Sequence, residues 1–319
     1  MLSNINFSIN ATQGLILSPT RELSIQIHEV VTRLGNVMKG LNVQLCIGGT
    51  SVEKDAHNLL RNKPHVVVGC AGRIYDLLCR KSLTFDKINT VVLDEADEML
   101  YGGFKDQIKE IFAFMPDKCQ FAFFSATVTH DMMDSVEEIM NDPLHIIVKK
   151  EALTLEGISQ YYVALNDDHQ KYETLKDLYS KISVSQCIIY CNSVSRVQHL
   201  TESLLAEEFP VCCIHSNMDK QDRTKALQDF KNGHHRILIS SDVTARGIDV
   251  QQVGIVINFD ICKSVHTYLH RIGRSGRWGR KGVGVNFVTR RDANKLSYIE
   301  SYYATQIQEL PMDFTQKII

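Results

Sequence analysis

The chain has 319 residues, of which 44% are hydrophobic and 23% are charged, and its formal net charge is -2 at pH 7. This length allows two domains of ordinary size, and the balanced charge excludes a chain that is strongly basic or acidic throughout. No apolar run approaches the roughly 18 residues that a membrane span needs, and no leader pattern opens the chain. We therefore expect a cytoplasmic protein, with the nucleus as the alternative, that has no membrane partner.

In the first half of the chain, short β-branched runs alternate with helical patterns. Runs that are apolar on both faces are typical of parallel strands covered by helices. A stripe of apolar residues, Leu23, Ile27, Val30, Val31 and Leu34, predicts a helix that starts near Pro19, where a missing N–H costs nothing. The predicted strands are Leu15–Leu17, Val43–Ile47, Val66–Val68, Val91–Leu93, Phe121–Phe124 and Ile146–Val148.

The charged segment 149–157 interrupts this rhythm, so we place a linker there, between domains of residues 1–148 and 158–319. Helical patterns such as Tyr172–Lys181 and Arg196–Glu207 then alternate with strands again. The predicted strands of this half are Ile158–Leu165, Ile188–Tyr190, Val211–Ile214, Ile237–Ser240, Ile255–Asn258 and Val285–Val288. Both halves therefore predict an α/β fold in which helices flank a mostly parallel sheet.

Nine cysteines are scattered through these apolar stretches, without a paired Cys-x-x-Cys framework. This usage predicts small buried hydrophobic residues in a reducing compartment. Cys213 and His215 lie close together in the sequence, but two further ligands at metal spacing are missing. We therefore do not expect a zinc site there.

Two carboxylates directly follow a predicted strand. Asp94 and Glu95 come after Val91–Leu93, at the edge where open parallel sheets bind ligands. Asp94 suits Mg²⁺, which prefers oxygen ligands and bridges nucleotide phosphates, and Glu95 suits a general base or the positioning of water. Acidic residues also end many strands without a catalytic role, so the pair alone leaves both interpretations open.

Hydroxyls and arginines follow other strands. Ser125 and Thr127 could bond to the acidic pair, or could simply cap the next helix. The segment from Arg271 to Arg291 contains seven basic residues and no acidic one. Arginines three residues apart can clamp a phosphate with their planar guanidinium groups, and the alternative is a solvated basic face.

Six short motifs, in this order, resemble those of the DEAD-box RNA helicases. They are Pro-Thr-Arg-Glu-Leu at 19–23, Gly-Gly at 48–49, Asp-Glu-Ala-Asp at 94–97, Ser-Ala-Thr at 125–127, Ala-Arg-Gly-Ile-Asp at 245–249 and His-Arg-Ile-Gly-Arg-Ser-Gly-Arg at 270–277. The resemblance covers essentially the whole chain. Leu153–Ile158 and Val283–Val288 indicate more narrowly the branch of translation initiation factor 4A.

The resemblance implies two RecA-like domains that close on ATP and Mg²⁺, with RNA lying across both. The catalytic residues that it implies are Asp94 for Mg²⁺, Glu95 for water, and Arg274 and Arg277 for the γ-phosphate. Gly247 and Asp249 would contact the nucleotide. Ser125, Thr127 and His270 would couple hydrolysis to strand separation.

The resemblance also implies RNA contacts in both domains. They are Pro19, Thr20, Arg21, Gly48, Gly49, Gly72 and Arg73 in the first, and Asn192, Arg223, Ser241 and Asp242 in the second. Such contacts go mostly to phosphates and sugars, so we expect binding of single-stranded or duplex RNA that is independent of sequence. From the residues alone, the glycine pair could be an ordinary turn and Arg73 an exposed cation at a helix start. The resemblance further implies a monomer, with a helical-repeat scaffold protein as a candidate partner.

The chain departs from the family pattern in its first domain. None of its 18 glycines begins the phosphate-binding motif Gly-x-x-x-x-Gly-Lys-Ser/Thr, and Cys70-Ala71 stand where the family has Thr-Pro. We expect a first domain truncated on its N-terminal side, with an unpaired sheet edge. Two functions remain open: an ATP-dependent RNA helicase whose first segment is not in this sequence, and a non-catalytic RNA-binding or scaffold-binding relative.

Overall fold

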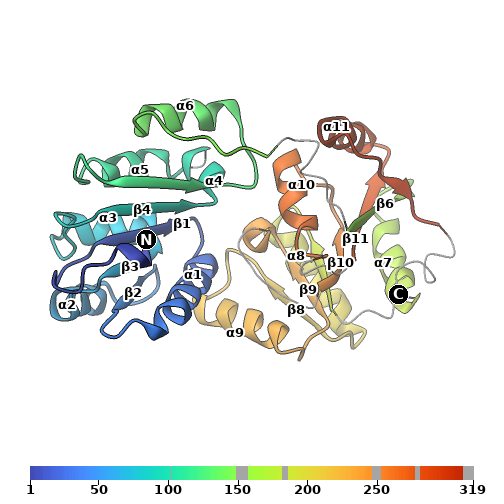
Figure 1. The fold of residues 1–319 in the computed structure, drawn as a ribbon. Helices are drawn as coiled ribbons and strands as arrows, with labels where there is room; N and C mark the ends of the chain where they lie inside the picture. The colour runs from blue at the N-terminus through green and yellow to red at the C-terminus, as the bar shows by residue number, and fades with distance from the viewer. Residues whose placement is uncertain (102, 149–156, 182–185, 246–252, 277–280, 312–319) are drawn as a thin grey trace. The chain divides into compact units, whose positions relative to one another are not determined.

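The structure, a computed structural model, describes residues 1–101, 103–148, 157–181, 186–245, 253–276 and 281–311. The chain divides into two compact units, Met1–His145 and Ile146–Ile319. Each unit contains one parallel sheet with helices packed on it (Figure 1), which confirms the predicted α/β fold. The predicted linker, 149–157, lies outside the described residues apart from Gly157.

Unit 1 is built on a five-stranded sheet of order β2-β3-β1-β4-β5. Its strands are β1 (Gly14–Ser18), β2 (Val43–Cys46), β3 (Val66–Cys70), β4 (Thr90–Asp94) and β5 (Gln120–Phe124). Its helices are η1 (Leu2–Asn4), α1 (Arg21–Leu34), η2 (Gly35–Val37), α2 (Val52–Asn62), α3 (Ala71–Cys79), α4 (Ala96–Tyr101), α5 (Lys105–Phe112) and α6 (His130–Ile139).

Both faces of this sheet are buried. Leu15 and Leu17 of β1 pack into a core completed by α3 to α6, whereas Ile16 between them packs on the opposite face with Val31 of α1. Alternate residues of a strand point to opposite faces, so a continuous apolar run is what a doubly covered strand requires. Among the described residues β2 and β5 are the two edge strands of this sheet, and β5 is the edge that exposes a large apolar side chain, with Phe124 57% exposed.

Unit 2 is built on a seven-stranded sheet of order β12-β6-β11-β10-β7-β9-β8. Its strands are β6 (Ile158–Leu165), β7 (Gln186–Tyr190), β8 (Val211–Ile214), β9 (Ile237–Ser240), β10 (Val253–Asn258), β11 (Gly282–Thr289) and β12 (Gln308–Glu309). Its helices are α7 (Gln170–Lys181), α8 (Val194–Ala206), α9 (Lys220–Lys231), η4 (Asp242–Thr244), α10 (Val265–Ile272) and α11 (Ala293–Tyr303). Separate apolar cores again cover the two faces.

Two predictions about elements are wrong. Ile146–Val148 forms no strand, and Ile146 is 87% exposed. A β-branched run has high strand propensity only where a neighbouring strand and a core receive it. The stripe predicted on α1 is also too wide, since Val30 and Leu34 are exposed while Leu23 and Val31 are buried. Within the described ranges, no helix is both long and apolar enough to cross a membrane.

Candidate functional sites

The predicted site residues of unit 1 follow the carboxyl ends of neighbouring strands. The register aligns Ser18 with Cys70 and Asp94 with Phe124, so the loops after these strands leave the sheet at one edge. The strand order puts the predicted RNA contacts on one half of that edge, after β2, β3 and β1, and the predicted catalytic and coupling residues on the other, after β4 and β5. This edge is where open parallel sheets place ligands.

The acidic pair ends β4 in a strained turn. Glu95 has a φ of +53°, and its N–H donates to Asp94 Oδ1 at 3.0 Å. A residue other than glycine in this region is uncommon and persists where the surrounding structure imposes it. Burial raises the pKa of Asp94, the Glu95 N–H offsets part of this rise, and the charge of Asp97 adds to it. A divalent cation would relieve this penalty, so the carboxylate fits the oxygen ligand that Mg²⁺ prefers.

A hydrogen bond ties the loop after β5 to the acidic segment. Thr127 Oγ1 donates to Asp97 Oδ2 at 2.6 Å, and Ser125 Oγ donates to the Thr127 carbonyl at 2.7 Å. The capping alternative for Ser125 is wrong, because Thr129 is the N-cap of α6. No separate role was predicted for Asp97, although its position three residues after Asp94 was a signal. This bond thus connects the first turn of α4, where Asp97 lies, to the loop after β5 at the catalytic half of the edge.

Arg73 is not the exposed cation that the sequence left as an alternative. Its guanidinium group forms an ion pair with Asp55 of α2 and donates to Thr50 Oγ1 at 2.9 Å and to the Thr50 carbonyl at 2.8 Å. Its side chain is only 8% exposed. Arg73 therefore fastens the start of α3 to the turn that follows Gly49. Asp55 was missed because nothing in the sequence brings it near residue 73.

The glycines of unit 1 leave room for a ligand's backbone. Gly49 has a φ of +92°, which favours glycine. A Cβ atom at Gly48 would meet nothing within 4 Å, and one at Gly72 would meet only Gln107 Oε1, at 3.7 Å. The protein's own packing therefore gives no reason for glycine at position 48, whereas close approach by a phosphate would.

The Pro19-Thr20-Arg21 segment forms the start of α1. Thr20 is its N-cap, and its Oγ1 accepts a hydrogen bond from the Leu23 N–H at 3.3 Å. The Cys70 thiol lies 3.3 Å from Ser24 Oγ of the same helix. Residues that follow β1 and β3 are therefore held together at the predicted RNA half of the edge.

In unit 2, the fully buried Arg271 holds the predicted RNA contacts in place. Its Nε donates to Asp242 Oδ1 at 2.6 Å, and its Nη2 donates to Asn192 Oδ1 at 2.8 Å. Its Nη1 donates to the Asp260 carbonyl at 2.8 Å. One rigid guanidinium group thus joins the loops that follow β7, β9 and β10. Arg271 belongs to the basic block predicted to bind anions, and for this fully buried residue that prediction is wrong.

The remaining predicted residues of unit 2 are placed unevenly. Ser241 follows β9, and Arg223 lies in the first turn of α9. His270 lies in the last turn of α10, and its backbone carbonyl accepts a hydrogen bond from Arg274 Nε at 3.1 Å. Gly247, Asp249 and Arg277 lie outside the described residues.

Two family models match the chain: DEAD/DEAH box helicase over residues 1–135, and helicase conserved C-terminal domain over residues 170–279. ATP-dependent RNA helicase eIF4A of Kluyveromyces lactis is 46% identical over 315 residues, which cover 99% of this chain and 79% of the relative. Eukaryotic initiation factor 4A of Caenorhabditis elegans is 47% identical over 311 residues, which cover 98% and 77%.

Solved structures share the fold. S. cerevisiae Dbp5 bound to RNA and ADP BeF3 matches with a TM-score of 0.92 and 30% identity, covering 99% of this chain and 84% of that chain. Mss116p bound to ssRNA and AMP-PNP matches with a TM-score of 0.86 at 24% identity, which is a likeness of fold alone. The RecA-like architecture expected for both units is thereby confirmed.

Proposed function

Because this chain belongs to the DEAD-box helicase family, in its initiation-factor-4A branch, we propose that the two halves of the unit 1 sheet edge have different tasks in an ATP-dependent RNA helicase. The loops after β4 and β5 serve ATP hydrolysis and its coupling, and those after β1, β2 and β3 bind RNA. The function itself, coupling of ATP hydrolysis to RNA binding and local strand separation, follows from membership of the family. The observation that carries the assignment of residues is the acidic turn at the end of β4, where Asp94 is half-buried with a raised pKa and Glu95 has a positive φ.

In this assignment Asp94 holds Mg²⁺ and Glu95 orients the attacking water. Bound Mg²⁺ supplies positive charge beside the phosphates that react. Thr127 donates a hydrogen bond to Asp97, so a movement of the acidic segment would also move the loop after β5. Ser125 supports the same loop through the Thr127 carbonyl. These two hydroxyls are therefore the coupling residues of unit 1.

The RNA contacts of unit 1 are assigned to the other half of the edge. Gly48 and Gly72 admit the sugar-phosphate backbone, and Arg73 orients the glycine turn. Thr20 and Arg21 start α1, whose N-terminus carries partial positive charge. None of these groups recognises a base, so binding is independent of sequence and weakens with salt.

In unit 2 we assign RNA contacts to Asn192, Arg223, Ser241 and Asp242. On the resemblance to the family, we assign Arg274 to the nucleotide, together with Gly247, Asp249 and Arg277, and we assign His270 to coupling. The relatives named as initiation factors support a role in translation and a cytoplasmic location. We further propose that the chain acts as a monomer.

A second candidate function is RNA or scaffold binding without catalysis. The phosphate-binding motif Gly-x-x-x-x-Gly-Lys-Ser/Thr does not occur in these 319 residues, and binding without catalysis does not need it. A solved structure of Dbp5 bound to Gle1, at a TM-score of 0.79 and 30% identity, supports a scaffold partner.

The test is phosphate release by the purified chain with ATP, Mg²⁺ and RNA. We expect RNA to stimulate release, and Glu95→Gln to lower it by about a hundredfold or more, as the loss of a group that positions the nucleophile does. Glu137→Gln makes the same change on an exposed face of α6 and should have no effect.

Three outcomes separate the candidates. Release that Glu95→Gln leaves unchanged would contradict the role of Glu95. RNA binding without any release by the unmodified chain would favour the second candidate. A chain that neither binds RNA at low salt nor releases phosphate would contradict both.

A further inference from the structure

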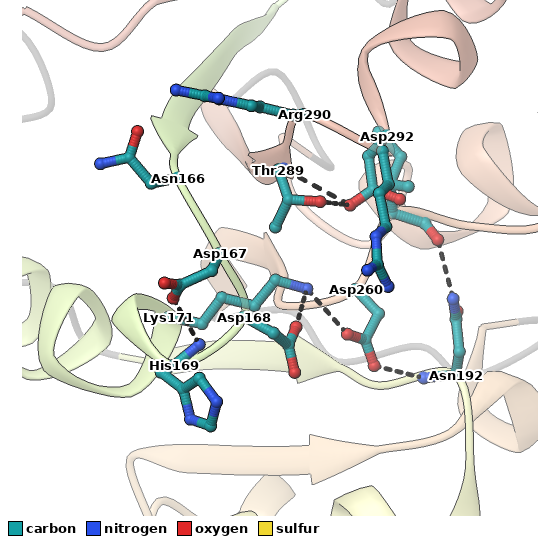
Figure 2. A pocket seen from close by; sticks show the side chains of 12 residues that line it. Asn166, Asp167, Asp168, His169, Lys171, Asn192, Asp260, Thr289, Arg290 and Asp292 are labelled. Carbon is teal, nitrogen blue, oxygen red and sulfur yellow. Dashed lines mark hydrogen bonds and ion pairs between the residues drawn. The ribbon is translucent and has the colours of Figure 1, made fainter.

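Unit 2 contains a polar cavity of about 590 Å³ at the carboxyl edge of its sheet (Figure 2). The loops that follow β6, β7, β10 and β11 form its walls, contributing among others Asn166, Asn192, Asp260 and Arg290. A cavity of this volume is in the range that encloses a small molecule or one unit of a polymer. The function proposed above uses only one of its lining residues, Asn192.

Two acidic residues of the cavity, the buried Asp260 and the exposed Asp168, form ion pairs within the protein. Asp260 accepts from Lys171 Nζ at 3.0 Å and from the Asn192 N–H at 3.0 Å. Asp168 accepts from Lys171 Nζ at 2.9 Å and from Arg196 at 2.6 Å. The Arg196 hydrogen bond lowers the pKa of Asp168 to about 2. These carboxylates therefore carry no demand for a cation from outside.

The other two acidic residues of the cavity are also bonded within the protein. Asp167 Oδ1 accepts the backbone N–H groups of His169 and Gln170 at 2.9 and 3.2 Å. Asp292 Oδ2 accepts from Thr289 Oγ1 at 2.7 Å. The negative charge on the walls of the cavity is thus committed to internal bonds.

Two guanidinium groups of the wall are not committed in this way. Arg290 and Arg291 are exposed between β11 and α11, and across the described part of the chain neither has an acidic side chain within ion-pair distance. Figure 2 shows the Arg290 side chain extending toward Asn166, while Asp292 lies with Thr289. An arginine offers several N–H donors in a plane that matches the oxygens of a phosphate.

The cavity adjoins the proposed RNA contacts of the same unit. The strands lie in the order β6-β11-β10-β7-β9, and Ser241 and Asp242 follow β9 while Asn192 follows β7. Arg271 donates hydrogen bonds to Asp242, Asn192 and the Asp260 carbonyl. One guanidinium group therefore holds proposed RNA contacts and residues that line the cavity in a fixed arrangement.

We propose that this cavity receives a further nucleotide of the bound RNA strand, and that Arg290 and Arg291 pair with its phosphates. The proposal rests on the RNA-binding function assigned above to unit 2. The cavity is continuous with the loops after β7 and β9, which favours RNA over an acidic protein segment. An RNA strand that extends past Asn192 along the sheet edge would reach the cavity next. The contacts go to phosphates, so the added site lengthens the bound strand without selecting its sequence.

The experiment measures the affinity of the full chain for a fluorescent oligouridine over a range of salt concentrations. Each phosphate contact to a single strand contributes about 0.7 to the slope of log affinity against log salt. The double variant Arg290→Ala/Arg291→Ala should therefore flatten the slope by about 1.4, which weakens binding by about 25-fold at about 0.1 M salt when the two affinities converge at about 1 M. Arg290→Lys/Arg291→Lys keeps both charges and should retain most of the slope.

The matched control is Lys181→Ala/Lys231→Ala, which removes two charges from the C-terminal ends of α7 and α9. These ends lie at the opposite edge of the sheet, so the slope should not change. A shorter oligouridine that no longer reaches the cavity should bind the double alanine variant and the unmodified chain equally. It should still bind both, because the loops after β7 and β9 are intact. Thermal melting of each variant should match the unmodified chain, since both arginines are exposed.

Equal slopes for Arg290→Ala/Arg291→Ala and the unmodified chain would overturn the inference while leaving the RNA function standing, and would assign the pair to another anionic ligand. Failure of the unmodified chain to bind oligouridine at low salt would overturn the RNA function and this inference with it. A slope that also flattens in Lys181→Ala/Lys231→Ala would overturn the assignment to this cavity.

Discussion

Gly48 is the residue at which ligand approach and protein packing are most clearly separated. A Cβ atom there meets nothing within 4 Å, and its φ is not in the left-handed region. Gly48→Ala should leave the free energy of unfolding within about 0.5 kcal/mol of the unmodified chain. If the RNA backbone passes over this turn, the added methyl group should weaken RNA binding by about tenfold, or about 1.4 kcal/mol.

The control for this prediction is Gly103→Ala, because a Cβ atom at Gly103 also meets nothing within 4 Å. Gly103 follows α4 and carries no proposed RNA contact. Chemical denaturation and RNA titration of both variants make the comparison. Equal RNA affinity for the two would mean that nothing approaches Gly48 closely.

Asp94 links catalysis to stability through pH. Its folded-state pKa is raised by burial, so the folded state binds more protons than the unfolded state above the ordinary value of about 3.9. Stability is therefore lost as pH rises through the raised pKa. Asp94→Asn mimics the protonated form, so at pH 7 without Mg²⁺ it should raise the free energy of unfolding, and the gain should vanish near pH 4.

Denaturation of both chains between pH 4 and pH 7 checks this sign. Added Mg²⁺ should stabilise the unmodified chain and leave Asp94→Asn unchanged, because only the carboxylate offers a ligand oxygen of full charge. An Asp94→Asn variant that is less stable than the unmodified chain at pH 7 would contradict this prediction. It would show that other groups of the folded protein stabilise the ionised Asp94 carboxylate.

At the scale of elements, the sequence predicts which apolar runs can form strands better than it predicts which of them find a neighbouring strand to pair with. Leu15–Leu17 and Ile237–Ser240 are strands because uninterrupted apolar runs suit a sheet covered on both faces. Ile146–Val148 has the same composition but lacks a strand beside it among the described residues. Composition therefore identifies a candidate strand, and tertiary contacts decide whether it forms.

The candidate site divides in the same way. Asp94, Glu95 and the glycine pair could be named from the sequence, because each stands at or just after the end of a strand. Asp55 and the fully buried Arg271 could not, since their roles depend on helices that bring residues 55 and 73, or 192 and 271, together. A basic block reads alike whether an arginine faces solvent, as Arg290 does, or fastens three loops, as Arg271 does.

At the scale of the whole molecule, the two units carry separate cores. Residues of β1 and β4 share one set of clusters, and residues of β7 and β10 share another. Each unit therefore has the buried apolar surface of an independent domain. Calorimetry of the full chain should show two unfolding transitions, and a change confined to one core or one sheet edge should move one of them.

Arg271→Lys is the change that tests this independence. Lysine keeps the charge but cannot reach Asp242, Asn192 and the Asp260 carbonyl at once, so a buried charge loses part of its hydrogen bonding and two of the three loops lose their donor. We expect unit 2 to lose about 3 kcal/mol, which for a domain of this size lowers its transition by about 10 °C. The transition of unit 1 should stay where it is, and Arg290→Lys, the same change at an exposed position, should move neither. A single transition that shifts as a whole in Arg271→Lys would mean that the two units unfold together.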